Sequence, residues 1–300
     1  KNEKLMTTEV ANMIIEKIDR ILNDNIFEGI NIHYFGGEPL LNIPVLVYLD
    51  ENIKKITDKI GIVYKAFLTT NGSMLSKELL QKVKFSSIQL TFDGLEKTHD
   101  RLRVSDHFHF KEEIELIENI MNFSQAKVLL RTNICKENKD EIIALHKYIF
   151  EKFGNERIEI NPNRTIKYHQ DDSFEMLSVQ EYAEVAYQIK LLWSEQKGKF
   201  ELPVPRSTPC KFPYGNAYAI SPEGYCTFCS GSMDQEKKYF FDVDIENKKM
   251  FSVRKECKKC NILPLCLGGC IIQYNLRAGA CTYEKYELKN ILISYIKHIS

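Results

Sequence analysis

The chain has 300 residues, of which 44% are hydrophobic, and its 41 basic side chains balance 41 acidic ones. This composition is typical of a soluble globular protein with room for one large domain and a smaller one. The balanced charge argues against nucleic acid or an anionic membrane as a partner, and no apolar run is long enough to cross a bilayer. Because the N-terminal residues lack an apolar signal sequence, we expect a cytoplasmic protein with reduced thiols.

Strands and helices alternate over the first two thirds of the sequence. Residues 8–23 carry apolar side chains at helical spacing behind a threonine that can cap the helix. Short β-branched and aromatic runs predict strands within 29–40, 63–72, 86–94, 126–134 and 157–163. Further helices are predicted at 45–61, 76–84, 110–123, 141–154 and 176–197. Such βαβ repeats predict a parallel sheet, open or closed into a barrel, with function at the carboxyl ends of the strands.

The last third of the sequence is rich in cysteine. The helical and strand patterns stop between about residues 195 and 209, where we expect a domain boundary, and a final helix is predicted at 283–299. Cysteines at CxxC spacing in a reducing compartment bind metal more often than they form disulfides, so iron–sulfur clusters, zinc and disulfides are all considered. The wide steps within CKKCNILPLCLGGC suit 4Fe–4S clusters. The eight clustered cysteines are Cys210, Cys226, Cys229, Cys257, Cys260, Cys266, Cys270 and Cys281.

The order and spacing of seven of these cysteines, with Gly224, resemble the SPASM domain of radical SAM enzymes. The resemblance implies two auxiliary 4Fe–4S clusters with crossed ligation. Auxiliary cluster II would be held by Cys257, Cys260, Cys266 and Cys281. Auxiliary cluster I would be held by Cys210, Cys229 and Cys270. Cys226 could complete cluster I, or cluster I could keep an open iron while Cys226 is a buried thiol.

The segment HYFGGEPLLN resembles the GGEP motif of radical SAM barrels. Two glycines let backbone groups approach a ligand, and a carboxylate can receive the ammonium group of S-adenosylmethionine (SAM). The resemblance implies SAM contacts at Gly36, Gly37, Glu38, Pro39, Thr70, Asn71, Thr91 and Arg131. The expected fold is α/β, with a partial (β/α)6 TIM-type barrel that lacks its first strand over residues 1–195. A SPASM domain with a C-terminal helix would occupy residues 196–300.

Radical SAM enzymes bind their catalytic cluster through CxxxCxxC, and these 300 residues contain no such motif. We therefore expect that segment, and a third 4Fe–4S cluster, to come from residues upstream of Lys1. The resemblance implies an enzyme that forms a 5′-deoxyadenosyl radical and modifies a ribosomally synthesised peptide, through a thioether or a related cross-link. Its expected partners are a precursor with a leader peptide and an electron donor such as flavodoxin or ferredoxin.

Two other functions are kept as alternatives. An anaerobic sulfatase-maturating type of enzyme would carry an aspartate directly after a hairpin cysteine, whereas Thr227 and Ser230 follow Cys226 and Cys229 here. A non-catalytic module that binds zinc or an iron–sulfur cluster is the alternative from another class. The sequence does not identify the substrate peptide or the catalytic residues.

Overall fold

The structure is a computed structural model, and it describes residues 4–24, 26–103, 105, 108–154, 157–167, 174–207, 210, 217–227, 238–242, 253–270 and 281–299. Cys229, a predicted ligand of auxiliary cluster I, lies outside the described residues. Within the described part, no helix combines the length and the apolar character that crossing a membrane requires.

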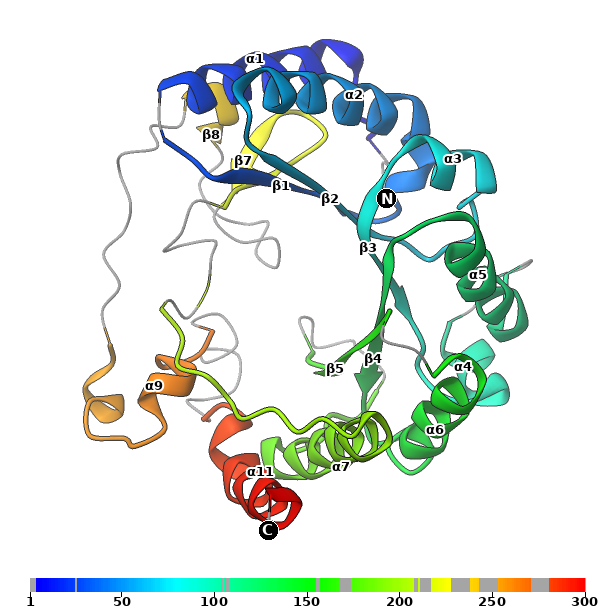
Figure 1. The fold of residues 1–300 in the computed structure, drawn as a ribbon, viewed down its shortest axis with the longest axis vertical. Helices are drawn as coiled ribbons and strands as arrows, with labels where there is room; N and C mark the ends of the chain where they lie inside the picture. Colours follow the sequence, from blue (N-terminus) through cyan, green and yellow to red (C-terminus); the bar gives the residue numbers. More distant parts are fainter. Residues whose placement is uncertain are drawn as a thin grey trace.

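Five parallel strands form one sheet in the order β1-β2-β3-β4-β5. The strands are β1 (Gly29–Tyr34), β2 (Val63–Thr69), β3 (Phe85–Thr91), β4 (Lys127–Ile134) and β5 (Ile158–Arg164). The sheet bends into an arc, and the helices that connect its strands lie on the convex side (Figure 1). β1, β2 and β4 lie within the predicted segments, whereas β3 begins and β5 ends one residue outside them. The predicted α/β fold of partial-barrel type is confirmed.

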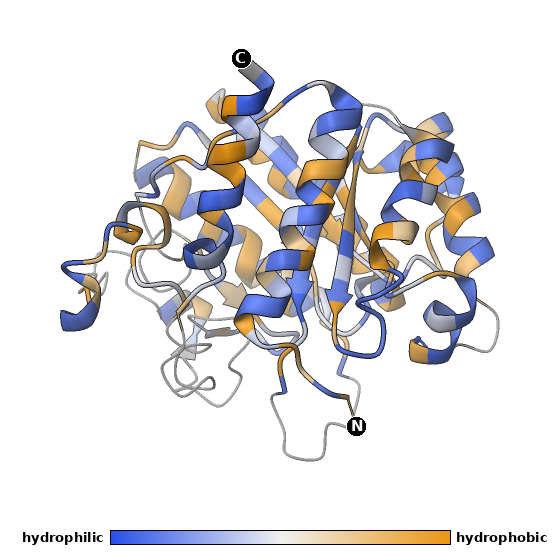
Figure 2. Cartoon of the chain, turned by 90° about the horizontal axis from the view of Figure 1, so that it is seen from below, coloured by the Kyte–Doolittle hydropathy of each residue, from blue (hydrophilic) through white to orange (hydrophobic). Residues whose placement is uncertain are grey.

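The helices of this layer are amphipathic. Figure 2 shows hydrophilic and hydrophobic residues side by side on the outer helices, as expected where one face packs on a sheet. One of them, α4, was not predicted, because seven residues are too few to show a helical period. The helices are α1 (Thr8–Asp24), α2 (Ile43–Ile60), α3 (Lys77–Lys82), α4 (Glu96–Leu102), α5 (Phe110–Phe123), α6 (Ile142–Phe153) and α7 (Val179–Lys197).

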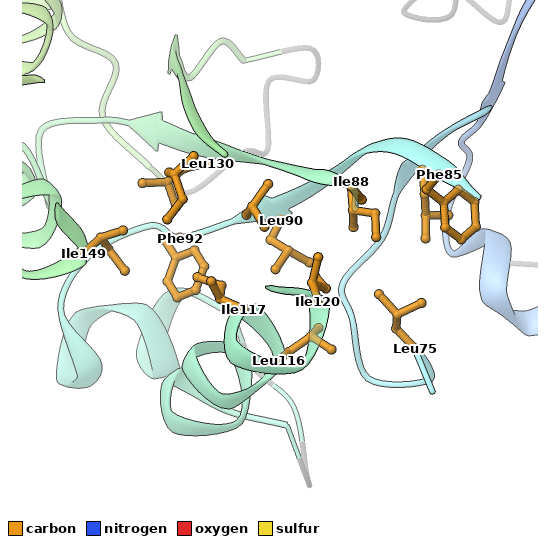
Figure 3. Packing of buried hydrophobic residues seen from close by; sticks show 14 of the residues in the cluster. Leu75, Phe85, Ile88, Leu90, Phe92, Leu116, Ile117, Ile120, Leu130 and Ile149 are labelled. Carbon is orange, nitrogen blue, oxygen red and sulfur yellow. The ribbon is translucent and has the colours of Figure 1, made fainter. Parts of the chain in front are cut away.

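The main hydrophobic core lies between the sheet and these helices. Ile88, Leu90 and Phe92 alternate with polar residues along β3 and its end, and they point toward Ile117 and Ile120 of α5 (Figure 3). Along β4 the same alternation buries every second residue. Gln89 of β3 and Arg131 of β4 alternate with these buried residues and therefore lie on the opposite, concave face of the sheet.

The C-terminal part packs against both ends of the arc. A second sheet of β6 (Ala219–Ile220), β7 (Tyr225–Thr227) and β8 (Lys238–Tyr239) is antiparallel. Cys226 of β7 and Phe240 of the 3-10 helix η2 (Phe240–Asp242) pack in a hydrophobic cluster with α1. The last helix, α11 (Glu284–Ile299), lies along α7 (Figure 1). A hydrogen bond of 2.6 Å between the hydroxyls of Tyr187 on α7 and Ser294 on α11 joins the two helices.

Candidate functional site

The GGEP motif forms an open loop after β1. Gly36 has a φ of 151°, a region that favours glycine, and a Cβ added at Gly36 or Gly37 would have no atom within 4 Å. Pro39 begins the 3-10 helix η1 (Pro39–Asn42), which runs directly into α2. The two glycines thus leave the backbone on one side of the loop accessible to a ligand.

Glu38 ties this loop to the end of β2. Its Oε1 accepts hydrogen bonds from the backbone N–H of Leu40 at 3.0 Å and the hydroxyl of Thr70 at 2.7 Å. Its Oε2 accepts from the backbone N–H of Asn71 at 2.8 Å. Because a carboxylate has about four acceptor sites, Oε2 can still accept from a further donor such as an ammonium group. Three predicted site residues therefore meet at one carboxylate.

Thr91 and Arg131 form a second group, at the ends of β3 and β4. They are register partners across these strands, and the Arg131 Nε donates to the Oδ1 of Asn133 at 2.9 Å. Thr91 is buried and Arg131 is half-buried. The structure thus brings the eight predicted SAM contacts together in two groups along the carboxyl edge of one sheet.

A buried asparagine that sequence reasoning missed holds the β3 and β4 ends together. The Nδ2 of Asn138 donates to the carbonyls of Asp93 at 2.8 Å and Asn133 at 2.9 Å, and the side chain is 1% exposed. The Oδ1 of Asp93 in turn accepts from the backbone N–H of Asn133 at 2.9 Å. The two contacts to Asp93 span 40 and 45 residues, so no local period or motif in the sequence marks them. They tie the ends of β3 and β4 to the loop that follows β4.

A buried acid and a buried imidazole lie beside this edge. The Nδ1 of His99 accepts from the backbone N–H of Asp93 at 3.4 Å, and its Nε2 lies 3.7 Å from the Oε2 of Glu113. Burial lowers the pKa of His99 to about 4 and raises the pKa of Glu113 to about 8. Both side chains are therefore predominantly uncharged at neutral pH.

Amide side chains are joined across the concave face of the sheet. The Nδ2 of Asn163 donates to the Oδ1 of Asn161 at 2.9 Å, and the Nδ2 of Asn161 donates to the Oε1 of Gln89 at 3.1 Å. This amide chain, Gln89–Asn161–Asn163, ends in the amide nitrogen of Gln89 and the amide oxygen of Asn163. The structure describes no partner for either end group. One end can donate and the other can accept, which matches the two polar groups of a peptide unit.

Four cysteines line one small pocket in the C-terminal part. This four-cysteine pocket is bounded by Cys257, Cys260, Cys266, Cys281, Arg254, Ile262, Leu263, Gly268, Thr282 and Lys285. The four cysteines come from the segment around the 3-10 helix η3 (Lys255–Cys257), from α9 (Leu263–Cys266) and from the residues before α11. These are the four residues predicted for auxiliary cluster II. Among the residues that the structure describes, no three His, Cys, Asp or Glu side chains converge as the ligands of one metal ion.

Nitrogen donors face three of the four sulfurs in this pocket. The Nη2 of Arg254 lies 3.6 Å from the Sγ of Cys257, and the backbone N–H of Gly268 donates to the Sγ of Cys266 at 3.4 Å. The Nζ of Lys285 lies 3.9 Å from the Sγ of Cys281. Such donors and cations suit an anionic metal–sulfur centre in this pocket.

The cysteines predicted for auxiliary cluster I are described only in part. Cys210 and Cys270 are half-buried and, like the other described cysteines, form no disulfide. Cys226 is 2% exposed in the hydrophobic cluster with α1, and burial raises the pKa of its thiol to about 11. Its surroundings favour the buried-thiol alternative over ligation.

A larger groove, of about 430 Å³, lies on the outer side of the sheet between α2 and α3. Its walls include Val47, Tyr48 and Leu79, and none of the predicted site residues lines it. We therefore place the candidate chemistry at the carboxyl edge of the sheet and in the four-cysteine pocket.

No protein-family model matches the sequence, and no curated protein matches it either. Solved structures of radical SAM enzymes do match it. Native anSMEcpe with bound AdoMet has a TM-score of 0.69 at 15% identity, over 100% of this chain and 93% of that chain. The same protein with AdoMet and the Kp18Cys peptide has a TM-score of 0.69 at 18% identity, over 98% of this chain and 90% of that one.

A third structure, SuiB from Streptococcus suis bound to S-adenosylmethionine, has a TM-score of 0.56 at 17% identity, over 87% of this chain and 66% of that chain. At these identities the likeness establishes the fold. The chain therefore has the fold of these AdoMet-bound structures, and the resemblance seen in its sequence motifs is confirmed at the level of the fold.

Proposed function

We propose that this protein is a radical SAM peptide maturase, with a partial barrel over residues 1–195 and a SPASM domain over 196–300. The observation that carries this proposal is the four-cysteine pocket, because its cysteines are the set that the motif assigns to auxiliary cluster II. It occurs in a chain whose fold is shared with structures that bind AdoMet.

The residues of the four-cysteine pocket fit a 4Fe–4S cluster. All four candidate ligands are sulfurs, and Arg254 and Lys285 supply positive charge next to an anionic group. Cys210, Cys229 and Cys270 would hold auxiliary cluster I. We propose that Cys226 remains a neutral thiol, because its hydrophobic surroundings and raised pKa oppose the thiolate form.

The carboxyl edge of the sheet fits SAM. The free acceptor capacity at the Oε2 of Glu38 suits the ammonium group, and the open backbone at Gly36 and Gly37 allows close approach. Arg131 and Thr91 would contact polar groups of the same molecule. When bound with its cluster, SAM supplies a 5′-deoxyadenosyl radical that abstracts hydrogen from the substrate. The residues of this chain bind and orient the reactants.

A peptide substrate is favoured by the amide chain on the concave face. Neutral amides with one donor and one acceptor that have no partner among the described residues suit a peptide backbone better than a charged small molecule. The structures of anSMEcpe with Kp18Cys and Cp18Cys peptides have the same fold. We propose a thioether or related cross-link over the sulfatase-type reaction, because Thr227 and Ser230 replace the aspartate expected of the latter.

Metal analysis of the anaerobically reconstituted chain tests the proposal. We expect iron and acid-labile sulfide in about equal amounts. Cys266→Ala should lose about half of both, whereas Cys135→Ala should lose neither, because Cys135 is a buried thiol after β4. Zinc without sulfide would overturn the iron–sulfur assignment and favour the non-catalytic module.

The catalytic part of the proposal needs a separate assay. The protein that includes the predicted upstream CxxxCxxC segment should form 5′-deoxyadenosine from SAM under reduction, measured by mass spectrometry. Loss of that product in Glu38→Ala, with unchanged iron content, would support the SAM site at the carboxyl edge. Unchanged SAM affinity in Glu38→Ala would contradict it.

A further inference from the structure

We propose that Arg254 and the backbone N–H of Gly268 raise the reduction potential of the cluster in the four-cysteine pocket by donating hydrogen bonds to its cysteine sulfurs. The inference rests on the proposed function, since it needs a cluster at this place. It concerns how readily that cluster accepts an electron and which residues of this chain control it.

Arg254 joins the two segments that carry three of the four cysteines. Its Nη2 donates to the carbonyl of Gly268 at 2.7 Å and lies 3.6 Å from the Sγ of Cys257. Its Nε also lies 3.2 Å from a carboxylate oxygen of Glu256. The planar guanidinium can satisfy several acceptors from one fixed position, so the N–H that faces the sulfur is oriented by its other contacts.

The backbone after α9 is shaped so that an N–H faces the second sulfur. The C-cap of α9 is Leu267, which has a φ of 48° although it is not glycine, and Gly268 follows with a φ of 86°. Left-handed backbone at a leucine is unfavourable and persists only where its surroundings require it. This turn places the Gly268 N–H 3.4 Å from the Sγ of Cys266.

Lys285 adds a positive charge on the opposite wall of the pocket. Its Nζ lies 3.9 Å from the Sγ of Cys281. The residue is in the first turn of α11, where a cation is unfavourable because the helix dipole is positive at that end. An anionic cluster in the pocket would offset this unfavourable helix position.

These contacts act on the oxidised and reduced cluster unequally. One-electron reduction places additional negative charge on a cluster and its cysteine sulfurs. Hydrogen-bond donors and cations next to those sulfurs stabilise the reduced form more than the oxidised form. The reduction potential of a 4Fe–4S cluster depends on hydrogen bonds to its sulfurs and on local charge, so both effects raise it here.

A redox titration with a matched control tests this. The chain carrying Cys210→Ala is reconstituted with iron and sulfide, so that only the four-cysteine pocket is proposed to hold a cluster, and is titrated with dithionite while the EPR signal of the reduced cluster is recorded. Arg254→Gln should lower the ratio of reduced to oxidised cluster at a given potential about tenfold, which is about 59 mV for one electron. Lys258→Gln should leave it unchanged, because Lys258 is an exposed neighbour of Cys257 with no described contact to a sulfur.

The possible outcomes separate this inference from the proposed function. An equal shift in both variants, or none in Arg254→Gln with normal iron content, overturns the role of the hydrogen bonds. If Arg254→Gln cannot be reconstituted, resonance Raman spectra of the unsubstituted chain in H2O and D2O decide. Iron–cysteine stretching bands that move on deuteration support the N–H···S bonds, and bands that do not move overturn them. Absence of iron and sulfide in the unsubstituted chain counts against the proposed function itself.

Discussion

Replacing Glu113 by glutamine is expected to stabilise the protein increasingly as the pH rises. The Glu113 side chain is 2% exposed, and burial raises its pKa from 4.5 to about 8. In the unfolded chain the carboxyl loses its proton near its ordinary pKa. The folded protein therefore binds an additional proton between these two pKa values, and its stability falls as the pH rises through that window. Glutamine has no proton to lose and removes this dependence.

The magnitude follows from the two pKa values. Each pKa unit is worth about 1.4 kcal/mol, so the free energy of unfolding of the glutamine variant, relative to the unsubstituted protein, should rise by about 4 kcal/mol from about pH 5 to about pH 9. His99 adds little to this difference, because its pKa of about 4 leaves it neutral throughout that range.

Urea unfolding under reducing conditions, followed by circular dichroism at several pH values, measures this difference. Glu115→Gln is the matched control, since Glu115 is exposed on the same helix and should give a difference that does not change with pH. If the stability difference for Glu113→Gln were also constant between these pH limits, Glu113 would ionise normally, and the reasoning from its burial would be refuted.

Two further predictions concern stability, one at a buried ion pair and one in the hydrophobic core. Lys190→Met should destabilise the chain by about 3 kcal/mol, because it leaves Glu287, which is 4% exposed and accepts from Lys190 through both oxygens, without its cation. Lys147→Met, at an exposed ion pair with Glu151, should change stability by less than about 0.5 kcal/mol, and similar losses in both variants would contradict this. Ile117→Ala should cost about 3 kcal/mol in urea unfolding, because this side chain of α5 is 0% exposed in the core between the helix and the sheet. Met13→Ala, at a side chain that is 40% exposed, should cost much less, and an equal cost would show that burial does not set the loss.

The pattern of hydrophobic residues along the sequence was sufficient to predict the strands of the main sheet. β4 illustrates the reason: every second side chain is buried, so the alternation along the sequence reflects the burial directly. The GGEP loop was likewise predictable, because the conformational freedom of Gly36 and the carboxylate of Glu38 are properties of single residues and their neighbours. The cysteine spacing identified in advance the four residues that line one pocket.

Other features arise only when distant segments meet. Asn138 bonds to the carbonyl of Asp93, and His99 lies against Glu113, yet neither pair leaves a repeating signal in the sequence. Cys226 has the spacing of a ligand, but its position against α1 surrounds it with hydrophobic side chains and raises its pKa.

The sequence by itself determined which residues form the strands and where its glycines, carboxylates and sulfurs lie along the chain, because those properties depend on side-chain type and short spacing. Only the tertiary structure decided which of them meet and what surrounds each one. Cys281 joins the pocket of Cys257 from another segment, and Arg254 faces a sulfur because Gly268 holds its guanidinium. Solvation, charge and hydrogen bonding at a site depend on contacts between segments that are far apart in the chain, and folding alone establishes them.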